Sequence, residues 1–325
     1  MPPITNGARP SPRRGVCTGP VESSVRWATT SRAGPWADVD QPDEPGEAVT
    51  TVPTRRVGSQ VLPLLRAAHF GPTVAVTTVV ALLALGQDLP TARGVVVTAA
   101  VFAGQLTIGW GNDLVDASRD QQVGRSDKPL ATGELRVSTV GAALGIAAVA
   151  CVVLSFLVGW RSGLVHLGLG VASGHAYNLW LKRTAWSWLP YAVAFGTLPA
   201  VVTLADLPHH WPPAWLMVAA AALGVAAHFL NALPDLGADE ATGVRGLPHR
   251  LGAGASRVAA IVLLVTASVV AVLGPAGTPD AWAWGALVVV LGLAVVAYVG
   301  RGRTPFQAAI AIALVDVLLL TVVTA

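Results

Sequence analysis

The sequence predicts an all-α protein, a bundle of nine transmembrane helices. Hydrophobic residues make up 53% of the 325 residues and charged residues only 12%, whereas soluble domains carry about 25% charged residues. The mean hydropathy is +0.60. The apolar residues also gather into runs of roughly 20 residues, the length with which a helix crosses the hydrocarbon core of a bilayer. These observations exclude an ordinary soluble enzyme.

The first 56 residues differ from the rest of the chain. They are rich in Pro, Gly, Ser, Thr and charged residues, and they show no helical or strand period. Such a segment cannot bury enough apolar surface to offset its ordering entropy. We therefore expect a disordered tail over 1–56 and a transmembrane domain over 57–325. No apolar core follows Arg13 and Arg14, so we do not expect a signal peptide.

Nine apolar runs are long enough to span a membrane. The two in the middle of the chain are the weakest, because only Lys182, Arg183 and a short segment rich in Trp and Pro separate them. The runs lie near 62–85, 94–117, 137–158, 163–181, 186–205, 213–233, 255–274, 281–300 and 304–324.

The basic residues indicate the orientation of these spans. If the N-terminus is cytoplasmic, eleven Lys and Arg fall in inside loops, and only Arg93 and Arg161 fall outside. The positive-inside rule favours this arrangement. We expect an integral protein of a bacterial cell membrane, with its C-terminus outside. Because the cations are scattered among apolar runs, the net charge of +3 does not indicate nucleic-acid binding.

A polar stretch lies at the end of the second apolar run. If it continues that helix, its carboxylates stand at i, i+3 and i+7 and share one face. The residues are Asn112, Asp113, Asp116 and Asp120. Carboxylates at this density repel one another unless something cationic lies between them. On that reasoning, neutralising one of them leaves the stability of the ligand-free protein the same or slightly higher.

A second polar stretch ends the sixth run. Asn231, Asp235 and Asp239 stand at i, i+4 and i+8, again one face if the helix continues. Both stretches fall on the predicted cytoplasmic side. Oxygen ligands alone suit a hard divalent ion such as Mg²⁺ rather than zinc. The two cysteines, Cys17 and Cys151, are too far apart in sequence to indicate a disulfide framework or a zinc site.

These motifs resemble those of the UbiA-type intramembrane prenyltransferases, a family with a nine-helix bundle. Residues 112–120 match its N-D-x-x-D-x-x-x-D motif, and residues 235–239 match its D-x-x-x-D motif. Residues 127–133 are similar to its basic-proline segment without a second proline, and 177–183 to its tyrosine-and-lysine element. The resemblance runs from about Leu62 to the C-terminus and implies transfer of a prenyl group from a prenyl diphosphate to an acceptor.

The resemblance also implies roles for individual residues. The Mg²⁺ ligands are then Asp113, Asp116, Asp120, Asp235 and Asp239, of which Asp113, Asp116 and Asp239 are catalytic. The substrate-binding residues are Asn112, Arg125, Lys128, Tyr177, Lys182, Arg183 and Asn231. Mg²⁺ and cations would stabilise the negative charge on the departing diphosphate. A groove open to membrane lipid would hold the isoprenoid tail.

Other polar residues near the spans have simpler interpretations. We interpret His175 as a hydrogen-bonded residue between helices and His228 as a residue packed in the core. We interpret Arg66 and His69 as residues at the membrane surface, where the first span begins. Asp316 lies inside the last span, and the sequence suggests no role for it.

Three alternatives stay open at this point. Transfer to a small aromatic acceptor, as in quinone biosynthesis, is favoured. Within the same fold, transfer to a lipid-like alcohol or cyclisation of the prenyl chain would need the same diphosphate site. A transporter is the less favoured reading, because transporters place carboxylates near the bilayer midplane rather than at one membrane surface.

Overall fold

The computed structural model describes residues 60–241, 243–302 and 304–324, which contain helices and no strand. The expected tail, 1–56, lies outside the described residues. The elements in chain order are α1 (Val61–Ala67), α2 (Phe70–Gly86), α3 (Thr91–Gln122), α4 (Val137–Val158), α5 (Trp160–Val165), the π-helix η2 (His166–Val171), α6 (Ala172–Leu179), the 3₁₀ turn η3 (Leu181–Arg183), α7 (Leu189–Thr203), α8 (Ala214–Ala232), α9 (Leu236–Ala241), α10 (Leu247–Leu273), α11 (Ala281–Val299) and α12 (Thr304–Thr324).

All nine predicted runs are helical, but nine full spans are not found. In the described part of the chain six helices are long and apolar enough to cross a membrane, and the bent pair α1 and α2 makes a seventh. The run near 163–181 is divided among α5, η2 and α6, and α7 has only 15 residues. The all-α membrane class is therefore right, and the count of nine is too high by this measure.

Helices are the expected form of these runs, because hydrocarbon offers no partner for backbone N–H and C=O groups. Proline and glycine set several of the ends. α3 begins after Pro90 and α8 after Pro213, whereas α4 ends at Gly159. Non-helical backbone at Gly252 divides α10 into a short first segment and a long apolar one.

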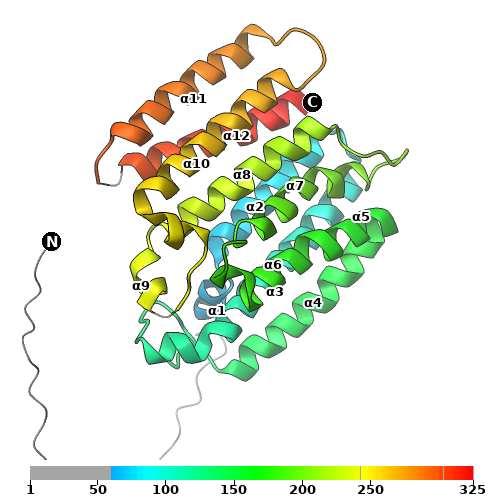
Figure 1. The fold of residues 1–325 in the computed structure, drawn as a ribbon. Helices are drawn as coiled ribbons and strands as arrows, with labels where there is room; N and C mark the ends of the chain where they lie inside the picture. The colour runs from blue at the N-terminus through cyan, green and yellow to red at the C-terminus, as the bar shows by residue number, and fades with distance from the viewer. Residues whose placement is uncertain (1–59, 242, 303, 325) are drawn as a thin grey trace, which may run out of the picture. The chain divides into compact units, whose positions relative to one another are not determined.

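The buried apolar side chains form separate clusters. In the C-terminal half, α8, α10, α11 and α12 pack together (Figure 1), and their buried side chains include Leu216, Leu264, Val290 and Ile312. A second cluster joins α2, α3 and α7 through Val80, Val97 and Val202. α4 and α11 bury only 22% of their apolar windows, so they lie at the periphery of the bundle.

The connections that carry the polar stretches gather at one end of the bundle. Figure 1 shows α1, the α3–α4 connection and α9 at this end. The α3–α4 connection packs inward through Leu130 and Leu135, which are each 3% exposed and join Trp110 of α3 in one cluster. This end of the bundle is where the candidate site is built.

Candidate active site

The first polar stretch lies on α3, as the helical spacing predicts. α3 is continuous from Thr91 to Gln122, and it carries the three carboxylates on one buried face. Asp113, Asp116 and Asp120 are only 2%, 4% and 5% exposed. Charges buried to this degree need partners.

Asp113 has two partners from different parts of the chain. Its Oδ1 accepts a hydrogen bond of 2.7 Å from Lys128 Nζ and lies 3.0 Å from His69 Nε2. His69 Nε2 also lies 3.3 Å from the side-chain Nδ2 of Asn112 and 2.9 Å from Lys128 Nζ. The α3–α4 connection and the α1–α2 bend therefore meet at this carboxylate.

A glycine on α3 permits that meeting. α1 and α2 are bent by 71° at Ala68 and His69, and His69 has left-handed backbone, with φ 51°. The bend packs against Gly109, where a Cβ atom would lie 2.2 Å from the carbonyl oxygen of Ala68. Only glycine allows such contact. Asp113 stands one turn further along α3, where the His69 ring reaches it.

Asp116 is bound to two cations. Lys182 Nζ donates to both of its oxygens, at 2.6 and 2.7 Å, and Arg119 lies 2.9 Å from Oδ2. The Lys182 and Asp116 side chains are 5% and 6% exposed. Burial lowers the pKa of Lys182, and the neighbouring Asp116 carboxylate partly offsets this. Arg119 also lies 3.9 Å from Asp120.

The repulsion expected from the sequence is thus relieved by the protein's own cations. Asp113 faces Lys128, Asp116 faces Lys182 and Arg119, and Asp120 faces Arg119. This pairing removes the basis for expecting unchanged stability when Asp116 is lost, because its loss would leave Lys182 buried without a counter-charge.

The second polar stretch is not one helical face. α8 ends at Ala232, residues 233–235 form a turn, and α9 begins at Leu236. Pro234 explains the break, because it has no N–H to continue the helix. Asn231 and Asp235 are exposed, whereas Asp239 is half-buried. Burial raises the pKa of Asp239, and nearby His249 partly offsets this.

Electrostatic neighbours connect the two stretches. Asp239 lies within electrostatic range of Arg119 and Arg125, and Arg125 lies within range of Asp120 and Asp235. The same two arginines therefore act on carboxylates of both motifs.

The predicted substrate-binding cations differ in how they are held. Lys128 and Lys182 are bound to α3 carboxylates, as described above. Arg125 makes a bidentate pair with Asp127, both bonds at 2.8 Å, and these bonds lower the pKa of Asp127 to about 2. Arg183 is exposed.

Tyr177 belongs to an aromatic group beside the carboxylates. Its ring meets Tyr191 edge to face at 5.2 Å, and His228 at 5.8 Å. Tyr177 is within electrostatic range of Asp239 and Asp116. His228 is 2% exposed and lies 3.0 Å from Ser187 Oγ, so it is packed in the core as the sequence suggested.

Sequence reasoning did not assign three residues that contact the motifs. His69 was interpreted as interfacial, but it lies against Asp113; Arg119 and His249 were not assigned a site role, but they contact Asp116 and Asp239. Arg119 carries the clearest signal, because it stands at i+3 from Asp116. His175 lies 3.3 Å from Thr107 Oγ1, in the interhelical role expected of it.

The carboxylate oxygens of the two polar stretches are ligands of the type that a hard cation such as Mg²⁺ prefers. Among the described residues no group of three or more His, Cys, Asp or Glu is arranged to hold a metal ion. The α3 carboxylates are instead engaged by lysine and arginine. Asp113 Oδ2, however, is buried and has no hydrogen-bond partner in the described structure. A carboxylate oxygen in this state is available to a cation of the type that prefers oxygen ligands.

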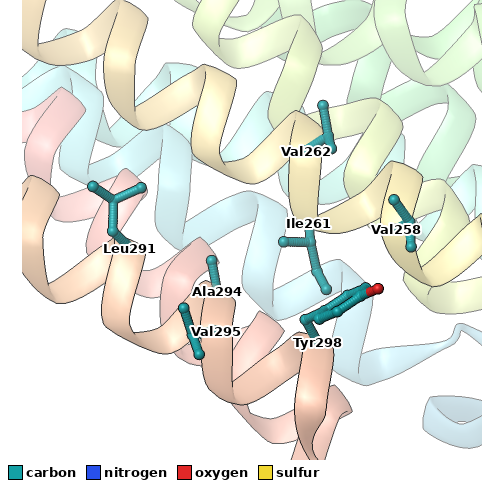
Figure 2. A pocket seen from close by; sticks show the side chains of 7 residues that line it. All are labelled: Val258, Ile261, Val262, Leu291, Ala294, Val295 and Tyr298. Carbon is teal, nitrogen blue, oxygen red and sulfur yellow. The ribbon is translucent and has the colours of Figure 1, made fainter.

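An apolar groove lies elsewhere, between α10 and α11. Figure 2 shows its lining, with the Tyr298 hydroxyl as the one polar group among the labelled side chains. The lining residues are Val258, Ile261, Val262, Leu291, Ala294, Val295 and Tyr298. Such a groove has no cation to hold a diphosphate, so it does not compete with the polar end of the bundle as the active site.

Comparison with known proteins supports one family. The sequence model described as the UbiA prenyltransferase family matches residues 73–320. None of the curated proteins with which the sequence was compared matches it.

Solved structures share the fold. A UbiA homolog from Archaeoglobus fulgidus bound to GPP and Mg²⁺ is 15% identical, with a TM-score of 0.59 over 80% of this chain and 98% of its own. The apo UbiA homolog from Aeropyrum pernix K1 is 16% identical, with a TM-score of 0.58 over 80% and 96%. A digeranylgeranylglyceryl phosphate synthase is 14% identical, with a TM-score of 0.57 over 82% and 98%.

Proposed function

Because the chain belongs to the UbiA prenyltransferase family, we propose that it transfers a prenyl group from a prenyl diphosphate to a small aromatic acceptor, with Mg²⁺ as its cofactor. The observation that carries the proposal is the buried face of α3, whose carboxylates are held by Lys128 and Lys182 from other segments and by Arg119 of α3 itself. The packing of the bundle does not require charged residues on this face, since apolar side chains of similar size would pack there at least as well.

The proposed ligands of Mg²⁺ are the five aspartates of the two stretches, Asp113, Asp116, Asp120, Asp235 and Asp239. When bound, Mg²⁺ would neutralise charge that develops on the diphosphate as the C–O bond breaks. Asn112 and Asn231 stand beside these aspartates and would orient the diphosphate by hydrogen bonds.

The cations of the site would bind the departing diphosphate. Lys182 is buried and Lys128 is 15% exposed, and both point at the α3 carboxylates. Arg125 lies in the α3–α4 connection, and Arg183 ends the 3₁₀ turn η3. In a site that excludes water, such charges stabilise a developing anion more than they would in solvent. The allylic cation left behind is then attacked by an electron-rich carbon of the acceptor ring, and the ring regains its aromaticity when that carbon loses its proton to water or to the released diphosphate.

The aromatic group of Tyr177, Tyr191 and His228 supports a flat acceptor. These rings lie beside the carboxylates and could pack edge to face against an acceptor ring. A lipid-like alcohol is the second candidate, because a protein of the same fold is named a digeranylgeranylglyceryl phosphate synthase. Cyclisation of the prenyl chain would require no acceptor at all.

The test is an assay of purified protein in detergent with Mg²⁺, prenyl diphosphates of several lengths, and aromatic or lipid-like acceptors. Mass spectrometry identifies the products. Asp116→Asn and Asp239→Asn should each nearly abolish transfer, compared at equal amounts of folded protein, whereas Asp280→Asn, outside both stretches, should not. Full activity in the first two variants would refute the assignment. Product formed without any acceptor would favour cyclisation.

We further propose that both polar stretches face the cytoplasm, as the eleven-to-two distribution of basic residues indicates. Single cysteines introduced at Gln122 and at Gly243 should react with an impermeant thiol reagent only after the membrane is opened. Labelling of either site in intact cells would overturn the orientation.

A further inference from the structure

The segment that follows the second polar stretch is fastened to the Lys182 turn. The Leu247 backbone N–H donates to Ser187 Oγ at 2.8 Å, and Ser187 is fully buried. Gly246 packs so closely that a Cβ atom there would lie 2.9 Å from both the Lys182 carbonyl oxygen and Ser187 Oγ. The start of α10 is therefore fixed relative to the lysine that binds Asp116.

His249 follows this anchor in the first turn of α10. Its side chain is 5% exposed, and its Nε2 lies 3.5 Å from Asp239 Oδ2. Neither ring nitrogen has a hydrogen-bond partner among the residues that the structure describes.

A buried imidazole in this state needs an explanation, because buried polar groups are nearly always hydrogen-bonded. Bonds between a ring N–H and a carboxylate are about 2.7–2.9 Å long. The distance to Asp239 exceeds that range by less than 1 Å. A small movement of α9, which carries Asp239, would close the contact.

We propose that His249 is a positioning residue that donates a hydrogen bond to Asp239 and holds its carboxylate toward the Mg²⁺–diphosphate ligand. This inference rests on the proposed function. Partners that orient a metal-binding carboxylate or imidazole typically change metal affinity or activity by about 10- to 100-fold when they are removed. The contacts of Gly246 and Leu247 fix the position of the His249 ring, and the ring in turn orients the Asp239 carboxylate.

Thermal unfolding of the purified protein tests the proposal without measuring catalysis. The probe is Mg²⁺ together with a non-hydrolysable analogue of geranyl diphosphate, titrated until the rise in Tm saturates. The variants are His249→Leu, His249→Gln, which keeps an N–H donor at similar reach, and Arg250→Gln as an exposed neighbour. His249→Leu should raise the half-saturating concentration about 10- to 100-fold, while the other two stay close to wild type.

The Tm without ligand separates positioning from a structural role. Because the imidazole has no hydrogen-bond partner to lose, His249→Leu should unfold at the wild-type temperature or above it. A lower Tm without ligand, wild-type ligand affinity in His249→Leu, or equal weakening in His249→Gln would each overturn the proposal. If the wild type itself shows no joint stabilisation, the proposed function fails and this inference falls with it.

Discussion

Replacing Asp116 by Asn should destabilise the ligand-free protein strongly. Lys182 Nζ lies within 2.7 Å of both Asp116 oxygens, and the two side chains are 5% and 6% exposed. Removing one partner of a buried pair leaves the other charge uncompensated, at a cost of about 3–5 kcal/mol. At roughly 2–4 °C of Tm per kcal/mol, the Tm should fall by about 6–20 °C.

The matched variant removes both charges. Asp116→Leu combined with Lys182→Met replaces the pair by apolar side chains of similar size, which for buried pairs is often neutral or stabilising. Arg119 keeps Asp120 as a partner in this variant. The double variant should therefore recover most of the Tm lost in Asp116→Asn.

Intrinsic tryptophan fluorescence during heating in detergent measures these transitions, and no Mg²⁺ or diphosphate should be present. If Asp116→Asn unfolds within about 2 °C of wild type, a shift too small for a buried pair, the ion pair does not contribute as argued. A double variant no more stable than Asp116→Asn would show that the unpaired Lys182 charge does not cause the loss of stability.

Three further outcomes are expected. Asp239→Asn should unfold at or above the wild-type temperature at pH 7, because burial raises the pKa of the Asp239 carboxyl and its negative charge therefore costs stability. The native state binds the carboxyl proton more tightly than the unfolded state does, so the Tm difference between variant and wild type should shrink as the pH falls through the raised pKa. Tm measurements from pH 7 to 4 would reveal this. Ser268→Ala should cost about 1–3 kcal/mol, because it leaves the fully buried Asp316 carboxyl without its hydrogen bond, and adding Asp316→Leu should restore the Tm. Deleting residues 2–50 should leave prenyl transfer in membranes largely intact, and loss of activity at normal expression would reveal a role for the tail.

Local patterns were sufficient to predict much of the fold. The apolar runs and their length predicted the all-α membrane class, and the i, i+3, i+7 spacing predicted that the three carboxylates of α3 share one face. These features depend on residues close in sequence and on the bilayer as solvent. Pro234 also indicates a break, since proline seldom continues a helix, whereas the i, i+4, i+8 spacing of the second stretch indicates a continuous helix.

The partners of the carboxylates could not be predicted in the same way. His69 and Asp113 are 44 residues apart, and Lys182 and Asp116 are 66 apart. Such pairs depend on how helices cross, and the sequence alone does not specify the crossing. The close packing of Gly109 against Ala68, which decides the first of them, has no local signature that separates it from the other glycines of the chain.

The bend at His69 implies a conflict between folding and function at a single position. Left-handed backbone is strained for any residue with a Cβ atom, by roughly 1–2 kcal/mol, and His69 adopts it with φ 51°. Glycine at this position would relieve the strain and stabilise the bend, yet it would remove the imidazole that reaches Asp113. Stability alone would favour glycine here, so the histidine marks a position where backbone strain accompanies a side chain that reaches the carboxylates.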